Sequence, residues 1–168
     1  PGMKSTPLAE ASSSLTPEVF WSQYVGPHNA VVLRNGLSGS IALEKWNDPE
    51  YLKRNFGDLE AKIEVKKESR GDKSVLKPKG RARIKDVIDG TVNSYIVSVV
   101  PHPMAWEVVV PSAVLCGDRE GRRYLDLPSA SLGSYLTQLE ETSLWISKGT
   151  TRSQLHYDKE NTMNCLVS

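Results

Sequence analysis

The sequence predicts an α+β fold, mainly β, in which short helices lead into a small β-barrel. Helix-start signals stand at residues 16–18 and 48–50, where a capping side chain is followed by proline and glutamate. The last 25 or so residues read instead as strand, polar turn, short extended stretch, turn and strand. A chain of 168 residues is long enough for one domain with its own core.

The N-terminal region is expected to begin with a tail and a helix. Residues 1–15 are rich in Ser, Ala and Pro and should form a loose tail, so the domain is placed at residues 16–168. In the first helix, Val19, Phe20 and Tyr24 would face the core.

A second helix is expected to start at Asp48 and to stop at Gly57, a residue type typical of helix C-termini. Residues 61–66 follow, and their alternation of apolar and charged side chains is typical of a half-buried strand.

Residues 69–85 form the one compositionally biased region, with many Lys and Arg residues and few acids. One interpretation is a basic surface that attracts an acidic protein segment or RNA. No aromatic residues alternate with these charges to stack on bases, so the favoured interpretation is a solvated loop. This loop would lead into a short helix that buries Ile84, Val87 and Ile88.

The C-terminal stretch supplies the barrel strands. Residues 144–147 read as a buried strand and are followed by a polar turn that contains a glycine. A further strand is expected at residues 162–167, with Thr162 and Asn164 on one face. Cys165 would lie on the opposite face as a buried free thiol.

Between these strands lie His156 and Asp158, the residues with the clearest chemical potential. Side chains two apart on an extended backbone point to the same face. One imidazole and one carboxylate are two members of the facial triad that binds Fe(II) and leaves coordination sites open. The ten residues after Asp158 contain no histidine. His102, between two prolines, is a poor candidate for the third ligand, and His28 is expected to lie in a turn.

This combination of an apolar strand, a Gly-Thr-rich turn, Ser153-x-x-His156-x-Asp158 and a strand near Asn-Cys-Leu-Val resembles the JmjC and cupin-like family of Fe(II)- and 2-oxoglutarate-dependent oxygenases. The likeness runs from about residue 16 to residue 168 and is strong only over the last 25 or so residues. It implies a double-stranded β-helix, or jelly roll, preceded by short helices. It also implies a chain that is incomplete at its C-terminus and ends within the barrel.

The resemblance assigns the site residues. His156 and Asp158 would be two iron ligands, and Ser153 and Tyr95 would hydrogen-bond a carboxylate of 2-oxoglutarate. Thr162 stands where the family commonly has asparagine, which puts the usual shape of the cosubstrate pocket in doubt; Thr162 and nearby Asn164 can still form hydrogen bonds there. The family's cosubstrate lysine and distal histidine would lie beyond the last residue of this sequence.

The resemblance therefore implies an Fe(II)/2-oxoglutarate dioxygenase that hydroxylates a protein side chain, while this chain alone is expected to be inactive. Two alternatives remain: a cupin-like metal protein without oxygenase chemistry, and a non-catalytic binding module.

Composition adds few constraints. A net charge of +1, from 21 basic and 20 acidic residues, gives no case for nucleic acid or a membrane surface as a partner. No apolar run approaches membrane-spanning length, and no Asn-x-Ser/Thr sequon is present, which together favour an intracellular location. Cys116 and Cys165 match no zinc-binding spacing. The sequence leaves the oligomeric state open.

Overall fold

The computed structural model describes residues 7–65, 80–92, 94–115, 129–136, 141–147 and 162–167. Its helices are α1 (Pro17–Phe20), α2 (Ile41–Lys45), α3 (Pro49–Phe56), α4 (Ile84–Asp89), α5 (His102–Ala105) and α6 (Ser112–Leu115), together with the π-helical η1 (Trp21–Val25) and the 3-10 helix η2 (Leu132–Tyr135). Its strands are β1 (Ala9–Ser12), β2 (Val31–Arg34), β3 (Glu60–Val65), β4 (Arg81–Arg83), β5 (Ser94–Val99), β6 (Val109–Pro111), β7 (Ser129–Ser131) and β8 (Ser143–Ile146). Within these described ranges, no helix is both long and apolar enough to cross a membrane.

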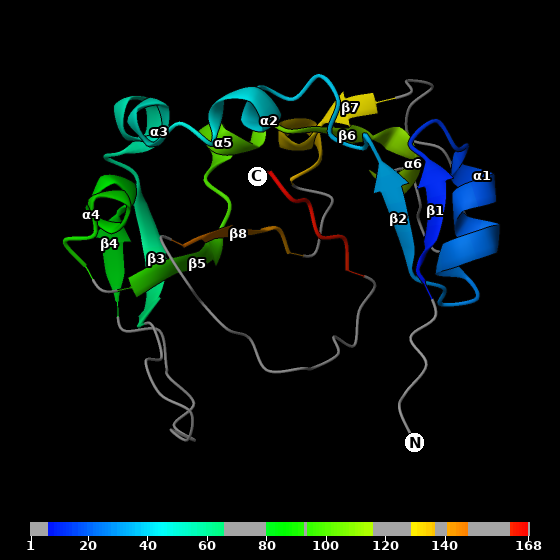
Figure 1. Cartoon of the computed structure of the whole chain (residues 1–168), viewed down its shortest axis with the longest axis horizontal. Helices are drawn as coiled ribbons and strands as arrows, with labels where there is room; N and C mark the ends of the chain where they lie inside the picture. Colours follow the sequence, from blue (N-terminus) through cyan, green and yellow to red (C-terminus); the bar gives the residue numbers. More distant parts are fainter. Residues whose placement is uncertain are drawn as a thin grey trace, which may run out of the picture.

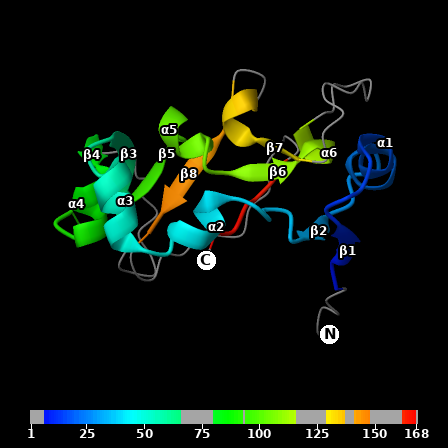
Figure 2. The ribbon, with the colours of Figure 1, turned by 90° about the horizontal axis from the view of Figure 1, so that it is seen from above.

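Three small sheets organise the described part of the chain. The largest has the strand order β4-β3-β5-β8 and is antiparallel throughout. Strands β6 and β7 form an antiparallel pair, whereas β1 and β2 pair in parallel. Figure 1 shows the four-stranded sheet with α3 and α4 at one end of the molecule, and β1, β2 and α1 at the other. In the view from above, α2, β6 and β7 bridge the two ends (Figure 2). Antiparallel sheets with short helices confirm the prediction of an α+β, mainly β fold.

Side-chain alternation on β5 divides the four-stranded sheet into two faces. Ser94, Ile96 and Ser98 are buried, whereas Tyr95 and Val97 are only half-buried. The buried face packs into the hydrophobic core with side chains from β3, β8, α3, α4, α5, β6 and η2. On the opposite face, which we call the open face, Val99 and Trp145 are exposed, and the candidate site lies there.

The predicted helix starts are confirmed by their caps. The Asp48 carboxylate accepts a hydrogen bond from the Glu50 backbone N–H at 2.9 Å at the start of α3. The Thr16 hydroxyl accepts one from the Val19 N–H at 3.4 Å at the start of α1. These bonds satisfy N–H groups that have no partner inside the helix. The predicted α4 is also confirmed, because it buries Ile84 and Val87.

Several local expectations differ from the structure. Residues 9–12, placed in the loose tail, form β1 and pair with β2. The strand expected at residues 162–167 is wrong, since these residues adopt no regular secondary structure. Cys165 is a free cysteine as predicted, but the residue is exposed; neighbouring protein atoms still desolvate its thiol enough to raise its pKa. Strand β8 is confirmed, although its Trp145 is 61% exposed and the strand is therefore buried on one face only.

Candidate functional site

Tyr95 is the predicted site residue whose surroundings the structure defines best. It lies on the open face of β5, directly across the strand pair from Glu64 on β3. Directly opposed side chains on neighbouring antiparallel strands lie close enough to interact. The Tyr95 hydroxyl donates a hydrogen bond to the Glu64 carboxylate over 2.5 Å.

This environment makes the Tyr95 hydroxyl harder to deprotonate than an ordinary phenol. Desolvation by burial is the largest cause, followed by the hydrogen bond to Glu64 and the charge of that carboxylate, and together they raise the pKa of Tyr95 to about 12. The phenol therefore stays neutral well above physiological pH and holds its single proton toward Glu64.

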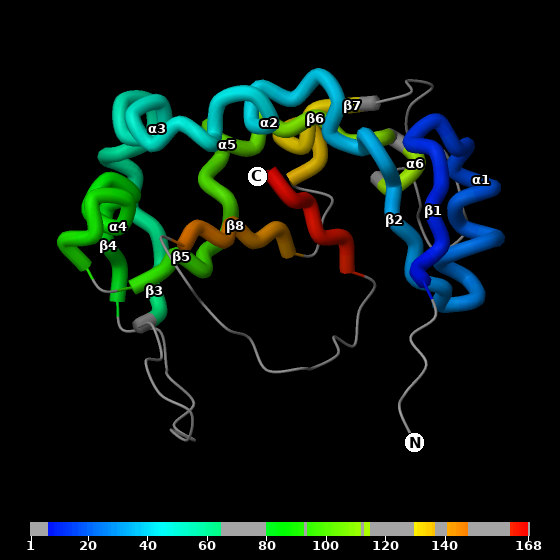
Figure 3. Tube along the Cα trace, in the orientation of Figure 1, coloured from blue at the N-terminus to red at the C-terminus, as the bar shows by residue number. Residues whose placement is uncertain are grey.

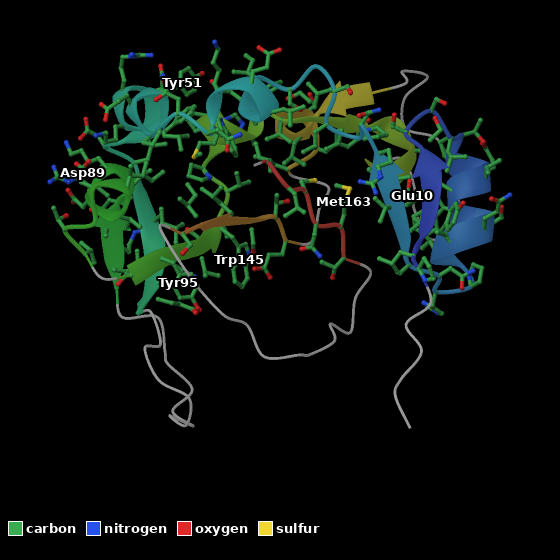
Figure 4. The ribbon with its side chains drawn as sticks, viewed as in Figure 1. Glu10, Tyr51, Asp89, Tyr95, Trp145 and Met163 are labelled. Atoms are coloured by element: carbon green, nitrogen blue, oxygen red, sulfur yellow. The ribbon has the colours of Figure 1, made fainter. Side chains whose placement is uncertain are left out.

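The third residue of the candidate site is Trp145 on β8, the strand that pairs with β5 on the side opposite β3. Its cross-strand partner is Val97, two residues after Tyr95 on the same face of β5. The Tyr95 and Trp145 rings are stacked, with their centroids 6.4 Å apart and an interplanar angle of 28°. Figure 4 shows both side chains on the same side of the sheet. Glu64, Tyr95 and Trp145 thus form a row across β3, β5 and β8, which we call the open-face triad.

The hydrogen bond from Tyr95 to Glu64 bears on the cosubstrate role that the resemblance assigns to Tyr95. A phenol has one proton to donate, and here Glu64 accepts it. To donate to a carboxylate of a bound anion, as the resemblance assigns to Tyr95, the hydroxyl would have to turn away from Glu64. Glu64 would then lack its donor, and a carboxylate on a partly desolvated face needs a donor or a cation.

The remaining predicted site residues lie in the C-terminal part of the chain. Ser153, His156 and Asp158 lie outside the described residues. Thr162 and Asn164 are exposed in the C-terminal segment, residues 162–167.

Figure 3 shows that segment in red, passing through the middle of the molecule with β8 on one side and β2 on the other. Its Val167 packs against the hydrophobic core. The hydrogen bond and the ring contact of Tyr95 are both made within the sheet rather than with this segment.

The other two histidines lie on unrelated elements. His28 has a left-handed backbone, with φ 59°, and lies in a turn as predicted. His102 is exposed, as expected of a residue between prolines, but it begins the short helix α5 rather than an irregular segment. Its Nδ1 accepts a hydrogen bond from the Trp106 indole at 3.3 Å. Within the ranges that the structure describes, no three His, Cys, Asp or Glu side chains gather closely enough to hold a metal ion.

The basic region has three described cations outside its loop, and each has an acidic neighbour. Arg81 pairs with Glu60, Arg83 with Asp86 and Lys85 with Asp58. This local neutralisation favours the interpretation as a solvated face for the part of the basic region from residue 80 onward. Residues 66–79 lie outside the described ranges.

Sequence reasoning missed Glu64 and Trp145 as site residues. The alternation over residues 61–66 already placed Glu64 on the polar face of its strand. Trp145 was obscured because the run Leu-Trp-Ile reads as continuously apolar, which suggests burial on both faces. Only the pairing of β5 with both β3 and β8 shows that the two residues flank the same tyrosine.

The sequence is similar to those of known proteins. The sequence profile of the family described as "Cupin-like domain" matches residues 17–168. One similar curated protein is the human bifunctional peptidase and (3S)-lysyl hydroxylase JMJD7, which is 25% identical over 165 residues. The match covers 91% of this chain and 49% of that relative, so the chain spans about half the length of the curated protein it matches. The profile match and the antiparallel sheets confirm the predicted cupin-like, jelly-roll fold.

Proposed function

Because the chain belongs to the cupin-like domain family, we propose that the protein containing it is an Fe(II)- and 2-oxoglutarate-dependent dioxygenase that hydroxylates a protein side chain. The observation that carries the proposal is that the family match runs through His156 and Asp158, the two residues with the donor chemistry of an iron site. The name of the human relative, a lysyl hydroxylase, supports a side chain as the target.

The donor set suits Fe(II), since a neutral imidazole and a carboxylate are members of its facial triad. Ser153, three residues before His156, would hydrogen-bond the cosubstrate, and Thr162 and Asn164 would line its pocket. Bound iron would supply the oxidising chemistry, in which O₂ is consumed, 2-oxoglutarate becomes succinate and CO₂, and one oxygen atom enters the substrate C–H bond.

Tyr95 would contribute by orienting the cosubstrate. A neutral phenol is a hydrogen-bond donor to a carboxylate without adding charge. A phenol is in that donor form at neutral pH, and the raised pKa of Tyr95 extends the donor form to higher pH. Its place on the open face of the sheet leaves the ring accessible to a ligand.

The first test measures metal binding by the 168-residue chain, with Mn(II) as the spin probe for electron paramagnetic resonance. We expect weak binding that His156→Ala or Asp158→Ala abolishes. His28→Asn is the matched control, because asparagine tolerates the left-handed turn there and removes one imidazole. His102→Ala tests whether His102 is a further metal ligand, since lost binding in this variant would identify it as one.

The second test measures succinate formation by the longest natural protein that contains this chain, with Fe(II), 2-oxoglutarate and a peptide library. We expect turnover and a product 16 Da heavier (about the mass of one oxygen atom), with His156→Ala lowering the rate at least about 100-fold. The 168-residue chain alone should show no turnover, because the resemblance assigns to it only two of the three ligands of the triad. Metal binding without 2-oxoglutarate dependence would instead favour a metal-binding cupin. Absence of both would favour a non-catalytic binding module.

A further inference from the structure

We propose that Asn35 is a site of spontaneous deamidation, at which the side-chain amide is lost and a carboxylate, partly in the isoaspartyl form, takes its place. The inference is independent of the proposed function. Its physical basis is an exposed asparagine that lies in a turn, has a left-handed backbone and is followed by glycine.

The first part of the argument is the residue that follows Asn35. Deamidation begins when the backbone nitrogen of the next residue attacks the carbonyl carbon of the asparagine side chain and closes a five-membered succinimide ring. A Cβ on that next residue hinders the approach, and glycine has none. Among the asparagines of the sequence, only Asn35 precedes a glycine. The steric barrier to ring closure is therefore lowest at this residue.

The second part is the freedom of the Asn35 side chain. The residue is exposed, and its amide makes no hydrogen bond within the described part of the chain. By contrast, the Asn29 amide donates to the Gln23 carbonyl at 3.1 Å, and the Asn55 amide donates to the Tyr51 carbonyl at 2.8 Å. Those two side chains are held by the backbone, whereas the Asn35 amide is free to rotate toward the nitrogen that attacks it.

The third part is the backbone of the turn. Asn35 has a φ of 58°, in the left-handed region that costs energy for any residue with a Cβ, although asparagine tolerates it better than most. The Gly36 N–H donates to the Leu33 carbonyl at 3.4 Å, which is longer than the usual range for such a bond. The attacking nitrogen is therefore only weakly held in its present position.

The reaction consumes only water. The Gly36 nitrogen loses its proton and bonds to the Asn35 side-chain carbonyl carbon, and the bond from that carbon to the amide nitrogen breaks and releases ammonia. Water then opens the succinimide at one of its two carbonyl carbons, giving aspartate or isoaspartate, and no electrons are transferred. The new carboxylate is adjacent in sequence to Arg34, which pairs with Glu10 at 2.6 Å. Deamidation would thus place a competing anion next to the ion pair that joins β2 to β1.

The test incubates the 168-residue chain at physiological pH and temperature and follows each asparagine by peptide mapping with mass spectrometry. Deamidation adds a single dalton, and isoaspartate is identified by methyl transfer from S-adenosylmethionine with a protein isoaspartyl methyltransferase. We expect both products at residue 35, formed at least about tenfold faster than at any other asparagine, which corresponds to a barrier lower by about 1.4 kcal/mol. The chain unfolded in urea gives the reference rate, and the folded rate should lie within about tenfold of it.

Two variants test the role of the glycine. Gly36→Ala adds a Cβ next to the attacking nitrogen and should slow the reaction at Asn35 at least about tenfold. That Cβ would lie 3.3 Å from the Leu33 carbonyl oxygen, and Gly36 does not have a left-handed φ, so the fold should tolerate the change. Ser38→Ala, at an exposed position in the same turn, is the matched control and should deamidate as wild type does. Amide NMR spectra of both variants report whether the fold is kept.

Three results would overturn the proposal. They are an unmodified Asn35 in the folded chain after the unfolded chain has been converted, equal rates at the other asparagines, and an unchanged rate in folded Gly36→Ala. If Gly36→Ala does not fold, the comparison among the asparagines of the wild-type chain still decides the question. Succinate turnover by the longer protein has no bearing on this outcome, because the reaction at Asn35 needs neither iron nor 2-oxoglutarate.

Discussion

The strongest electrostatic prediction concerns the pair formed by Tyr95 and Glu64. In the folded protein the pKa of Tyr95 is raised to about 12, against an ordinary value of 10.0. The largest cause is desolvation, and the two smaller ones both come from Glu64, through its hydrogen bond and its charge. The substitution Glu64→Gln removes the charge and leaves the burial, so it separates these causes.

The expected change in the pKa of Tyr95 follows from the order of these causes. In Glu64→Gln the pKa of Tyr95 should fall below 12, because ionisation no longer places two negative charges side by side. It should remain above 10, because the ring is still partly desolvated. At pH 11 a tyrosine with a pKa of 12 is ionised to about one tenth, whereas a normal one is ionised to about nine tenths. The variant should fall between these limits.

The assay is ¹³C NMR of the tyrosine Cζ atoms between pH 9 and 11.5, with the Tyr95 signal identified by its loss in Tyr95→Phe. Glu60→Gln serves as the control and should leave the titration unchanged. A Tyr95 pKa that stays at about 12 in Glu64→Gln would show that the charge of Glu64 contributes nothing. A value of 10 would show that burial is not the main cause. Either result would refute the reasoning.

Three further predictions concern stability. Since the folded pKa of Tyr95 lies above the unfolded value, its contribution to stability should be complete below pH 10 and lost as the pH rises toward 12; urea titrations of wild type and Tyr95→Phe should show this difference. Glu107 accepts hydrogen bonds from the Trp46 indole at 2.7 Å and the Tyr51 hydroxyl at 2.5 Å. Glu107→Ala should therefore lower the free energy of unfolding by about 2–4 kcal/mol, and an unchanged urea midpoint would contradict this role. In Gly133→Ala the new Cβ would lie 2.5 Å from the Trp106 ring, which should cost about 1–2 kcal/mol in the same titration. An unchanged urea midpoint would contradict this, because it would mean that the indole moves aside without cost.

Caps and side-chain alternation in the sequence predicted those helices and strands that are determined by residues close together in the chain. Asp48 and Thr16 cap their helices as expected, because a cap involves a side chain and a backbone group only two or three residues apart. Strand β3 was likewise readable from the alternation that buries Ala61 and Ile63. These features require no knowledge of the tertiary fold.

Features that depend on distant pairing were predicted less well. Ala9 and its neighbours read as tail residues, and only the pairing of β1 with β2 makes them a strand. Thr162 and Cys165 read as parts of a strand, but no described strand pairs with this segment, so it lacks the ladder of backbone hydrogen bonds that defines a sheet. Trp145 read as buried because a single strand does not show which of its faces meets the core. Ser153, His156 and Asp158 remain predictions, since they lie outside the described residues.

The cosubstrate role proposed for Tyr95 and the pKa of that residue are linked by reciprocity. A 2-oxoglutarate carboxylate that accepts the Tyr95 hydrogen bond would place a second negative charge beside the phenol, so its binding should raise the pKa of Tyr95 further. The same coupling requires that 2-oxoglutarate bind less tightly once Tyr95 is ionised. A Tyr95 pKa that is unaffected by saturating 2-oxoglutarate would mean that the cosubstrate carboxylate does not reach this hydroxyl.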